Sequence, residues 1–142
     1  MGDDDRNNLK EKIGDNKKII FIDSVPDLRP YLKAADVVVS MCGYNMASEI
    51  VFHGARAVVS PRTWRFGEHA NRDSVKKDKE QIMRAKSLAK SGLLQLIEPE
   101  KLTSDLLAEK VSHALTLPYP ERNHSINING LLTAVKLIRE MI

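Results

Sequence analysis

Short runs of apolar residues alternate with segments of helical periodicity along most of the chain. Four runs of Ile, Val, Leu or Ala are bounded by charged residues, glycine or proline, which is typical of buried strands. One of them, Val37-Val38-Val39, has no polar alternation, as expected for a parallel strand covered on both faces. The predicted strands are 18–23, 36–40, 55–60 and 93–97.

Helices are predicted between these strands, from apolar residues spaced three or four positions apart. Gly54 and Gly92 stand where two of them should end, and Thr103 or Ser104 is a suitable N-cap for a third. Residues 62–78 are polar and are predicted to be irregular. The predicted helices are 27–35, 45–53, 79–90, 103–117 and 129–142.

The order of these elements predicts the architecture. Strands and helices alternate with short connections, so the strands should be parallel and the helices should cover both faces of the sheet. The expected fold class is α/β, a Rossmann-like open parallel sheet. Residues 1–18 are expected to be a polar tail or a frayed helix, and residues 19–142 to form one domain.

Composition limits the class of protein. A chain of 142 residues can bury one core without disulfides or structural metals. Its 42% hydrophobic and 29% charged residues are typical of a soluble globular domain, and the single cysteine, Cys42, fits a reducing compartment. No Cys/His cluster has metal-ligand spacing, and no apolar stretch reaches the roughly 18 residues of a membrane span. Because the acidic N-terminus is no secretory signal, we expect a cytoplasmic protein.

The net charge of +3 conceals a basic segment between Arg62 and Lys90, with nine Lys and Arg residues against four acidic ones. This segment therefore carries +5 and the rest of the chain −2. Such an asymmetry indicates either a solvated helix face or a surface that meets an anion, such as a phosphate or an acidic membrane. Nucleic acid is not an expected partner, because the basic segment is the only feature that favours it.

Chemistry is expected at the turn after the second predicted strand. Ligands of open parallel sheets bind at the carboxyl ends of the strands. Gly43 precedes a predicted helix there, and the free amides and positive dipole of a helix N-terminus favour a phosphate. Glu49, about one turn further on, is placed either to accept hydrogen bonds from vicinal hydroxyls or to complement the helix dipole. Neither feature alone distinguishes a binding site from an ordinary turn.

A longer series of residues resembles the donor-sugar signature of GT-B glycosyltransferases. It consists of Met41-Cys42-Gly43-Tyr44-Asn45-Met46-Ala47-Ser48-Glu49, then Gly54, Pro61, Glu80-Gln81 and Gly92. Together with Phe21-Ile22-Asp23 and Ala35-Asp36-Val37-Val38-Val39, it is similar to the bacterial family that adds N-acetylglucosamine to the lipid-linked cell-wall precursor, glycosyltransferase family 28. The resemblance covers residues 19–142 and implies the C-terminal, donor-binding half of a GT-B fold.

The resemblance assigns roles around the turn. Gly43, Tyr44 and Asn45 would hold the diphosphate of a UDP-sugar, and Glu49 would bind the ribose hydroxyls through charge-assisted hydrogen bonds. Tyr44 is alternatively a plain packing residue. Met46 departs from the Ser or Thr of the family, so that only its backbone N–H can serve. This change should weaken donor binding or shift its preference.

The same resemblance extends the site to other segments. Phe21 and Ile22 would meet the uracil edge through backbone groups. Gln81, with Glu80, would read sugar hydroxyls, and Arg62 would touch the diphosphate; Gln81 is alternatively an exposed helix residue and Arg62 a solvated loop cation. No metal and no cofactor besides the donor are implied. The implied donor-binding residues are Phe21, Ile22, Cys42, Gly43, Tyr44, Asn45, Met46, Glu49, Arg62, Glu80 and Gln81.

Relative to the family, residues 64–79 are an insertion, and they make up much of the basic segment. We expect either a disordered surface loop or a lid that brings cationic side chains near a phosphate. These side chains are Arg65, His69 and Arg72. The other histidines, His53, His113 and His124, are expected at the surface or at helix edges.

The resemblance also implies what the chain lacks. GT-B enzymes hold the acceptor in an N-terminal domain, and this chain is expected to begin one or two strand–helix units inside the donor domain. It should therefore act as a hexosyltransferase only together with an N-terminal acceptor domain or a partner subunit, and it should be inactive alone. Peripheral association with a membrane is compatible with this expectation. The alternatives are a nucleotide-sugar 2-epimerase half, which shares the two-domain fold, and a non-catalytic regulatory or assembly module with a vestigial phosphate turn.

Overall fold

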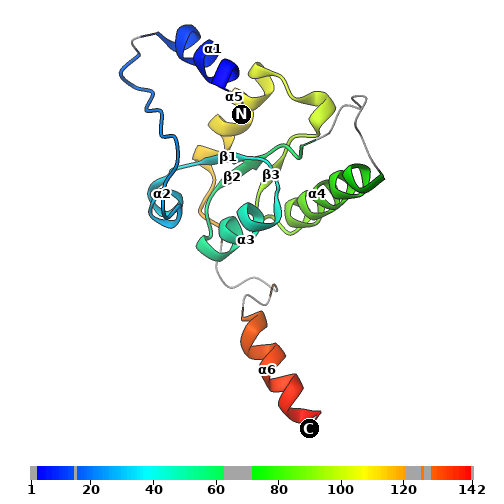
Figure 1. The fold of residues 1–142 in the computed structure, drawn as a ribbon. Coiled ribbons are helices and arrows are strands. Elements are labelled where there is room, and N and C mark those ends of the chain that lie inside the picture. Colours follow the sequence, from blue (N-terminus) through cyan, green and yellow to red (C-terminus); the bar gives the residue numbers. More distant parts are fainter. Residues whose placement is uncertain (1–2, 15, 63–71, 121–125, 127–128, 142) are drawn as a thin grey trace.

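The computed structural model describes residues 3–14, 16–62, 72–120, 126 and 129–141. Figure 1 shows the elements coloured along the chain. The strands are β1 (Val38–Ser40), β2 (Ala57–Val59) and β3 (Gln95–Leu96). The helices are α1 (Asp3–Ile13), α2 (Arg29–Ala34), α3 (Tyr44–His53), α4 (Arg72–Lys90), α5 (Ser104–Thr116) and α6 (Gly130–Glu140), and a 3-10 turn, η1, spans Pro99–Lys101.

The three strands form one parallel sheet in the order β1-β2-β3. Val39 pairs with Val58 across the first pair of strands, and Val59 pairs with Leu96 across the second. α3 connects β1 to β2 and α4 connects β2 to β3, because parallel neighbours require a crossover. The predicted parallel α/β fold is confirmed, as are the strands within 36–40, 55–60 and 93–97, each of them shorter than predicted.

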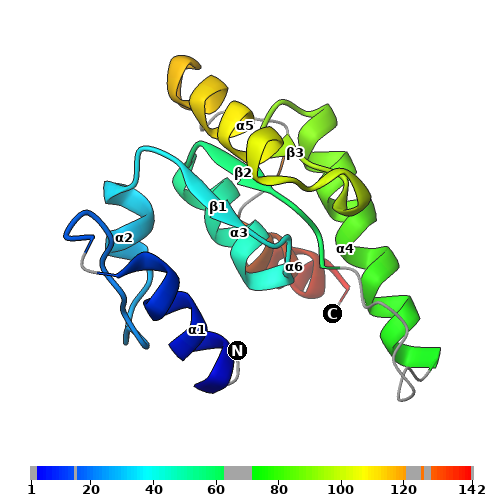
Figure 2. The ribbon, with the colours of Figure 1, turned by 90° about the horizontal axis from the view of Figure 1, so that it is seen from above.

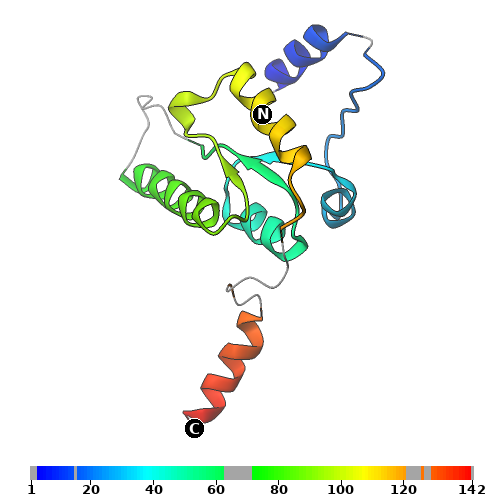
Figure 3. The same cartoon turned by 180° about the vertical axis from the view of Figure 1, so that it is seen from behind.

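Helices lie on both faces of the sheet, as Figures 2 and 3 show from two directions. Val39 remains 52% exposed, so the expectation that β1 is covered on both faces is wrong. Successive side chains of a strand point to opposite faces. On β2, Ala57 and Val59 belong to a core formed with α2, α3 and α4, whereas Val58 belongs to a second core formed with α5. Val58 and Val59 are both fully buried, which explains why this strand reads as an unbroken apolar run.

The strand predicted at 18–23 is wrong. Residues 19–22 form no strand, and their apolar side chains remain exposed, Ile20 to 82%. A strand needs a neighbouring edge with which to exchange backbone hydrogen bonds. In Figure 1 this segment runs between α1 and α2, away from β1, because α2 docks on α3 and directs the preceding chain outward.

The structure also corrects the prediction that residues 62–78 are irregular. α4 begins at Arg72, so its first seven residues belong to a segment that we predicted to be a loop. These residues contain neither glycine nor proline, and Lys is a good helix former. High charge alone therefore did not interrupt the helix. The rest of the expected insertion, residues 63–71, lies outside the described residues.

The last helix, α6, extends away from the body of the domain in Figures 1 and 3. Its apolar side chains recur at helical spacing, yet none of its residues is buried. Among the described helices, α6 included, none has both the length and the apolar character needed to cross a membrane. The exposed large apolar residues of α6 and its C-cap are Leu131, Leu132, Val135, Leu137, Ile138 and Met141.

The end of α3 depends on a glycine. Gly54 adopts φ 62° and ψ 36°, the left-handed conformation. Its N–H donates to the carbonyl of Val51, and the N–H of Ala55 donates to that of Ile50, which closes the helix in a Schellman motif. The predicted glycine stop at this position is confirmed.

We predict that Gly54→Ala lowers the free energy of unfolding by about 1–2 kcal/mol, because a Cβ disfavours the left-handed conformation. Urea unfolding followed by circular dichroism measures the loss. The matched control is Gly130→Ala, at the first position of α6, where the added Cβ meets open space. Equal stability of the Gly54 variant and the wild type would contradict the prediction.

Candidate functional site

The amino end of α3 lies directly after the carboxyl end of β1. Gly43 is its N-cap, with extended backbone, and no side chain caps the helix. The first amide to bond inside the helix is that of Ala47, which donates to the Gly43 carbonyl at 2.9 Å. Within the described residues, the amides of Tyr44, Asn45 and Met46 therefore have no acceptor. Three free donors and the positive end of the helix dipole meet at one place.

A guanidinium from α4 stands beside this turn. Nη1 of Arg84 donates to the carbonyl of Cys42 at 3.1 Å, and its Cζ lies 5.5 Å from the centroid of the Tyr44 ring. Arg84 was not among the residues implied by the sequence. Its spacing could have revealed it, because it follows Gln81 by three positions and so lies on the same face of α4.

The loop after β2 is tied to the same helix. Oε1 of Gln81 accepts a hydrogen bond from the backbone N–H of Arg62 at 3.2 Å. This bond leaves the amide NH2 of Gln81 as the group that can donate to a ligand. Glu80, the preceding residue, is exposed. Gln81 is thus held by the loop and is not a freely exposed helix residue.

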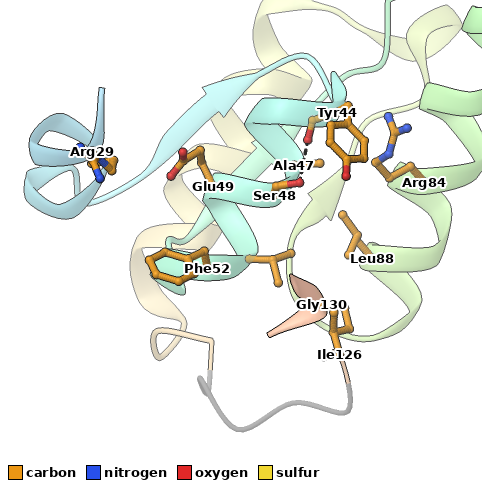
Figure 4. A pocket seen from close by; sticks show the side chains of 11 residues that line it. Arg29, Tyr44, Ala47, Ser48, Glu49, Phe52, Arg84, Leu88, Ile126 and Gly130 are labelled. Atoms are coloured by element: carbon orange, nitrogen blue, oxygen red, sulfur yellow. Dashed lines mark hydrogen bonds between the residues drawn. The ribbon is translucent and has the colours of Figure 1, made fainter. Parts of the chain in front are cut away.

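A cavity of about 610 Å³ lies along α3. Figure 4 shows that it extends from Arg29 of α2 on one side to Arg84 and Leu88 of α4 on the other. The ring of Tyr44, exposed to 72%, and the carboxylate of Glu49 both line it. The cavity is lined by Arg29, Tyr44, Ala47, Ser48, Glu49, Val51, Phe52, Arg84, Leu88, Ile126 and Gly130.

The carboxylate of Glu49 is close to the imidazole of His53 and lies in the electrostatic field of the Arg29 guanidinium. Its Oε2 is 3.2 Å from Nε2 of His53, and 38% of its side chain is exposed. A hydrogen bond with Asp27 chiefly raises the pKa of Arg29, and the charge of Glu49 adds a smaller increase. Glu49 is therefore within the electrostatic field of Arg29, although the guanidinium itself pairs with Asp27 at 2.8 Å.

Other implied residues serve the fold rather than the surface of the turn. Cys42 is fully buried, and burial raises the pKa of its thiol while Arg84 offsets part of that increase. The side chain of Met46 packs against the core below α3, so only its backbone faces the turn. Phe21 and Ile22 do not line the cavity, and the strand expected to place them does not form.

The histidines also differ from expectation. His53 is not a surface histidine, because only 5% of its side chain is exposed. His113 is exposed, with Nδ1 3.3 Å from Oε1 of Gln95, and His124 lies outside the described residues, as do Arg65 and His69. Across the part of the chain that the structure describes, no group of His, Cys, Asp or Glu is arranged to hold a metal ion.

A second cavity, of about 410 Å³, lies at the opposite edge of the sheet, below the end of α5. Arg56, Gln95 and Tyr119 line it, and the Arg56 guanidinium stacks on the Tyr119 ring at 3.9 Å. The strands begin at this edge, whereas ligands of open parallel sheets bind where strands end. The first cavity runs along α3 and reaches, at Tyr44, the turn that follows the end of β1, so it is the candidate site.

Comparison with known proteins identifies the family. The glycosyltransferase family 28 C-terminal domain matches residues 1–138, nearly the whole chain. The chain belongs to this family. No curated protein matches it. Because the match reaches residue 1, it includes α1, which lies within residues 1–18, the segment predicted to be a polar tail or a frayed helix.

A solved structure supports the same fold. The crystal structure of glycosyltransferase VinC in complex with DTDP superposes with a TM-score of 0.59 and 20% sequence identity. The superposition covers 79% of this chain and 25% of that one, so the chain spans a quarter of that structure's length. At this identity the likeness shows the fold alone. It confirms the predicted fold class, a Rossmann-like parallel α/β domain that forms one half of a GT-B fold.

We predict that Arg84→Ala in this family 28 domain lowers the free energy of unfolding by about 1–2 kcal/mol, because it removes a charge-assisted bond to the Cys42 carbonyl. Lys79→Ala is the matched control, since it removes an exposed charge from the same helix. Chemical denaturation compares the two variants. A loss of stability that is the same for both would show that the bond contributes nothing.

Proposed function

We propose that this family 28 domain binds a UDP-sugar at the amino end of α3 and positions it for transfer to an acceptor. The observation that carries the proposal is the combination, on one helix, of three amides that have no acceptor among the described residues and a carboxylate that lines the adjoining cavity. The first group suits a diphosphate and the second suits the hydroxyls of a ribose.

In this proposal the turn acts mainly on the leaving group. Cleavage of the sugar–phosphate bond leaves negative charge on the diphosphate. The free amides of Tyr44, Asn45 and Met46 are fixed by the helix and stabilise that charge without reorganising. Arg84 adds a full positive charge beside them, held by its bond to Cys42. Catalysis would then consist of positioning and charge stabilisation.

The preference for a ribonucleoside over a deoxyribonucleoside follows from Glu49. A ribose presents two adjacent hydroxyls to a carboxylate, whereas the deoxyribose of the nucleotide bound to VinC presents one. A charged acceptor with two oxygens gains most from two donors. We therefore favour a uridine donor over a deoxythymidine donor. Gln81 and Glu80, near the middle of α4, are proposed to read the transferred hexose.

The acceptor is proposed to lie on a second domain or a partner subunit. The exposed apolar face of α6, including Leu131, Val135 and Ile138, supports this part of the proposal. Contiguous apolar faces of this kind mark contacts with other proteins or with membranes. Without the other half of the cleft the chain would bind the donor without transferring the sugar.

We place the protein in the cytoplasm, with peripheral attachment to an acidic membrane through its basic segment.

Flotation with vesicles that contain phosphatidylglycerol tests the membrane attachment. If charge drives it, the chain floats with acidic vesicles at low salt and is released at high salt, because salt screens exposed charges. Neutral phosphatidylcholine vesicles are the control. Binding that is equal for both vesicle types would instead implicate the apolar face of α6.

We predict that UDP raises the melting temperature of the chain more than ADP or GDP does, and that Glu49→Ala weakens UDP binding by about 10–100-fold, since a charged hydrogen bond contributes about 1.5–3 kcal/mol. Thermal shift and isothermal titration calorimetry measure the two effects. Glu109→Ala, on the exposed side of α5, is the control.

The outcomes separate the candidate functions. Unchanged UDP affinity in the Glu49 variant would reject the proposed site. Absence of any nucleotide response would favour the regulatory or assembly module. The supporting observation is that an apolar, partly buried side chain, Met46, stands in the family's phosphate turn. Inversion of the donor sugar at C2 by an assembled enzyme, with no acceptor consumed, would favour the 2-epimerase.

A further inference from the structure

His53 occupies an unusual position beneath the candidate site. It is the last residue of α3, one turn after Glu49, and only 5% of its side chain is exposed. Its ring meets the ring of Phe52 edge-on, with centroids 5.0 Å apart and an interplanar angle of 87°. A buried polar side chain normally has a hydrogen-bonding partner. The role of this histidine is therefore inferred from the polar group that lies near its Nε2.

That group is the carboxylate of Glu49. Nε2 of His53 lies 3.2 Å from Oε2 of Glu49, which is within ion-pairing distance, but within the described residues it forms no hydrogen bond, with Glu49 or with any other group. No hydrogen bond inside the described part of the chain reaches the other oxygen, Oε1. One oxygen of the carboxylate thus faces the buried imidazole, and the other remains available at the cavity wall.

This arrangement affects binding through the freedom of Glu49. A glutamate side chain has three rotatable bonds, and fixing them on ligand binding costs conformational entropy. A partner that holds the carboxylate beforehand removes part of that cost. The other charged group that faces Glu49 is Arg29 of α2, but its guanidinium is engaged by Asp27. The imidazole is within ion-pairing distance of the carboxylate, and its Nε2, which has no hydrogen-bond partner among the described residues, is free to form the bond that would fix it.

We propose that His53 is a positioning residue that holds Glu49 in the orientation in which Oε1 accepts the ribose hydroxyls of the donor. The proposal rests on the nucleotide-binding function proposed above. It assigns to His53 a role in recognising the ribose, with no contact to the ligand itself.

The experiment compares two ligands that differ only in the ribose hydroxyls: UDP and 2′,3′-dideoxy-UDP. His53→Phe keeps an aromatic ring in the buried space but removes the nitrogen, and His53→Gln restores an N–H at similar reach. We expect His53→Phe to weaken UDP binding about tenfold and to leave the affinity for the dideoxy analogue unchanged within twofold. His53→Gln should recover most of the loss. Isothermal titration calorimetry measures the affinities of the wild type and of both variants for the two ligands.

A double variant shows whether the effect passes through Glu49. In the Glu49→Ala background, His53→Phe should cause no further loss of UDP affinity, because the group that it positions is gone. His113→Phe, in the exposed part of α5, is the control for changing a histidine to phenylalanine. Melting temperatures of all variants establish that they are folded.

The results distinguish this inference from the proposed function. If Glu49→Ala weakens UDP binding but His53→Phe does not, the positioning role is overturned and the nucleotide site stands. Equal weakening of UDP and the dideoxy analogue by His53→Phe would reveal a merely structural histidine and also overturn it. If Glu49→Ala changes nothing, both proposals fail. If His53→Phe does not fold, His53→Gln is compared with His53→Asn instead. Only the Gln side chain is long enough to reach Glu49, so only His53→Gln should retain the preference for UDP over the dideoxy analogue.

Discussion

The burial of α3 against the sheet decides where the free amides of that helix point. Ala47, Ile50 and Val51 are buried on the inner face of α3, and Gly54 closes the helix so that the chain can return into β2. Because β1 and β2 are parallel, the helix between them must begin at the edge where the strands end. The unpaired amides at its start therefore face that edge, beyond the core and open to a ligand.

The rest of the candidate site is attached to this arrangement. Arg84 reaches the turn because α4 packs on the same face of the sheet as α3, where Ala85 and Leu88 are buried in the shared core. Glu49 lies at the margin between buried and exposed residues of α3. Its carboxylate can therefore meet both a buried imidazole and the cavity. Arg84 and Glu49, which would bind a ligand, are thus held in place because the residue next to each of them in the sequence is buried in the core.

The apolar surface of this domain is not fully covered by the described chain. The segment 19–22, Val39 of β1 and the face of α6 all present large apolar side chains to solvent. Each has a sequence pattern that is typical of a buried element. The first two are unbroken apolar runs, as in buried strands, and the third has apolar residues at helical spacing. Such patterns predict which residues are apolar, but an apolar side chain becomes buried only when another surface covers it.

Local sequence determined much of this protein. The unbroken valine runs gave β1 and β2, Gly54 gave the end of α3, and Thr103 accepts a hydrogen bond from the N–H of Leu106 as the N-cap of α5. The order of motifs from Gly43 to Gln81 gave the family. These features depend on residues close together in the chain, where backbone conformation and periodicity act directly. Only the tertiary structure decided that residues 19–22 have no strand partner, that Arg84 reaches Cys42 from α4, and that His53 is buried beside Glu49. Those outcomes depend on which elements meet in space, because a hydrogen bond or a buried contact requires a second surface that local sequence does not specify.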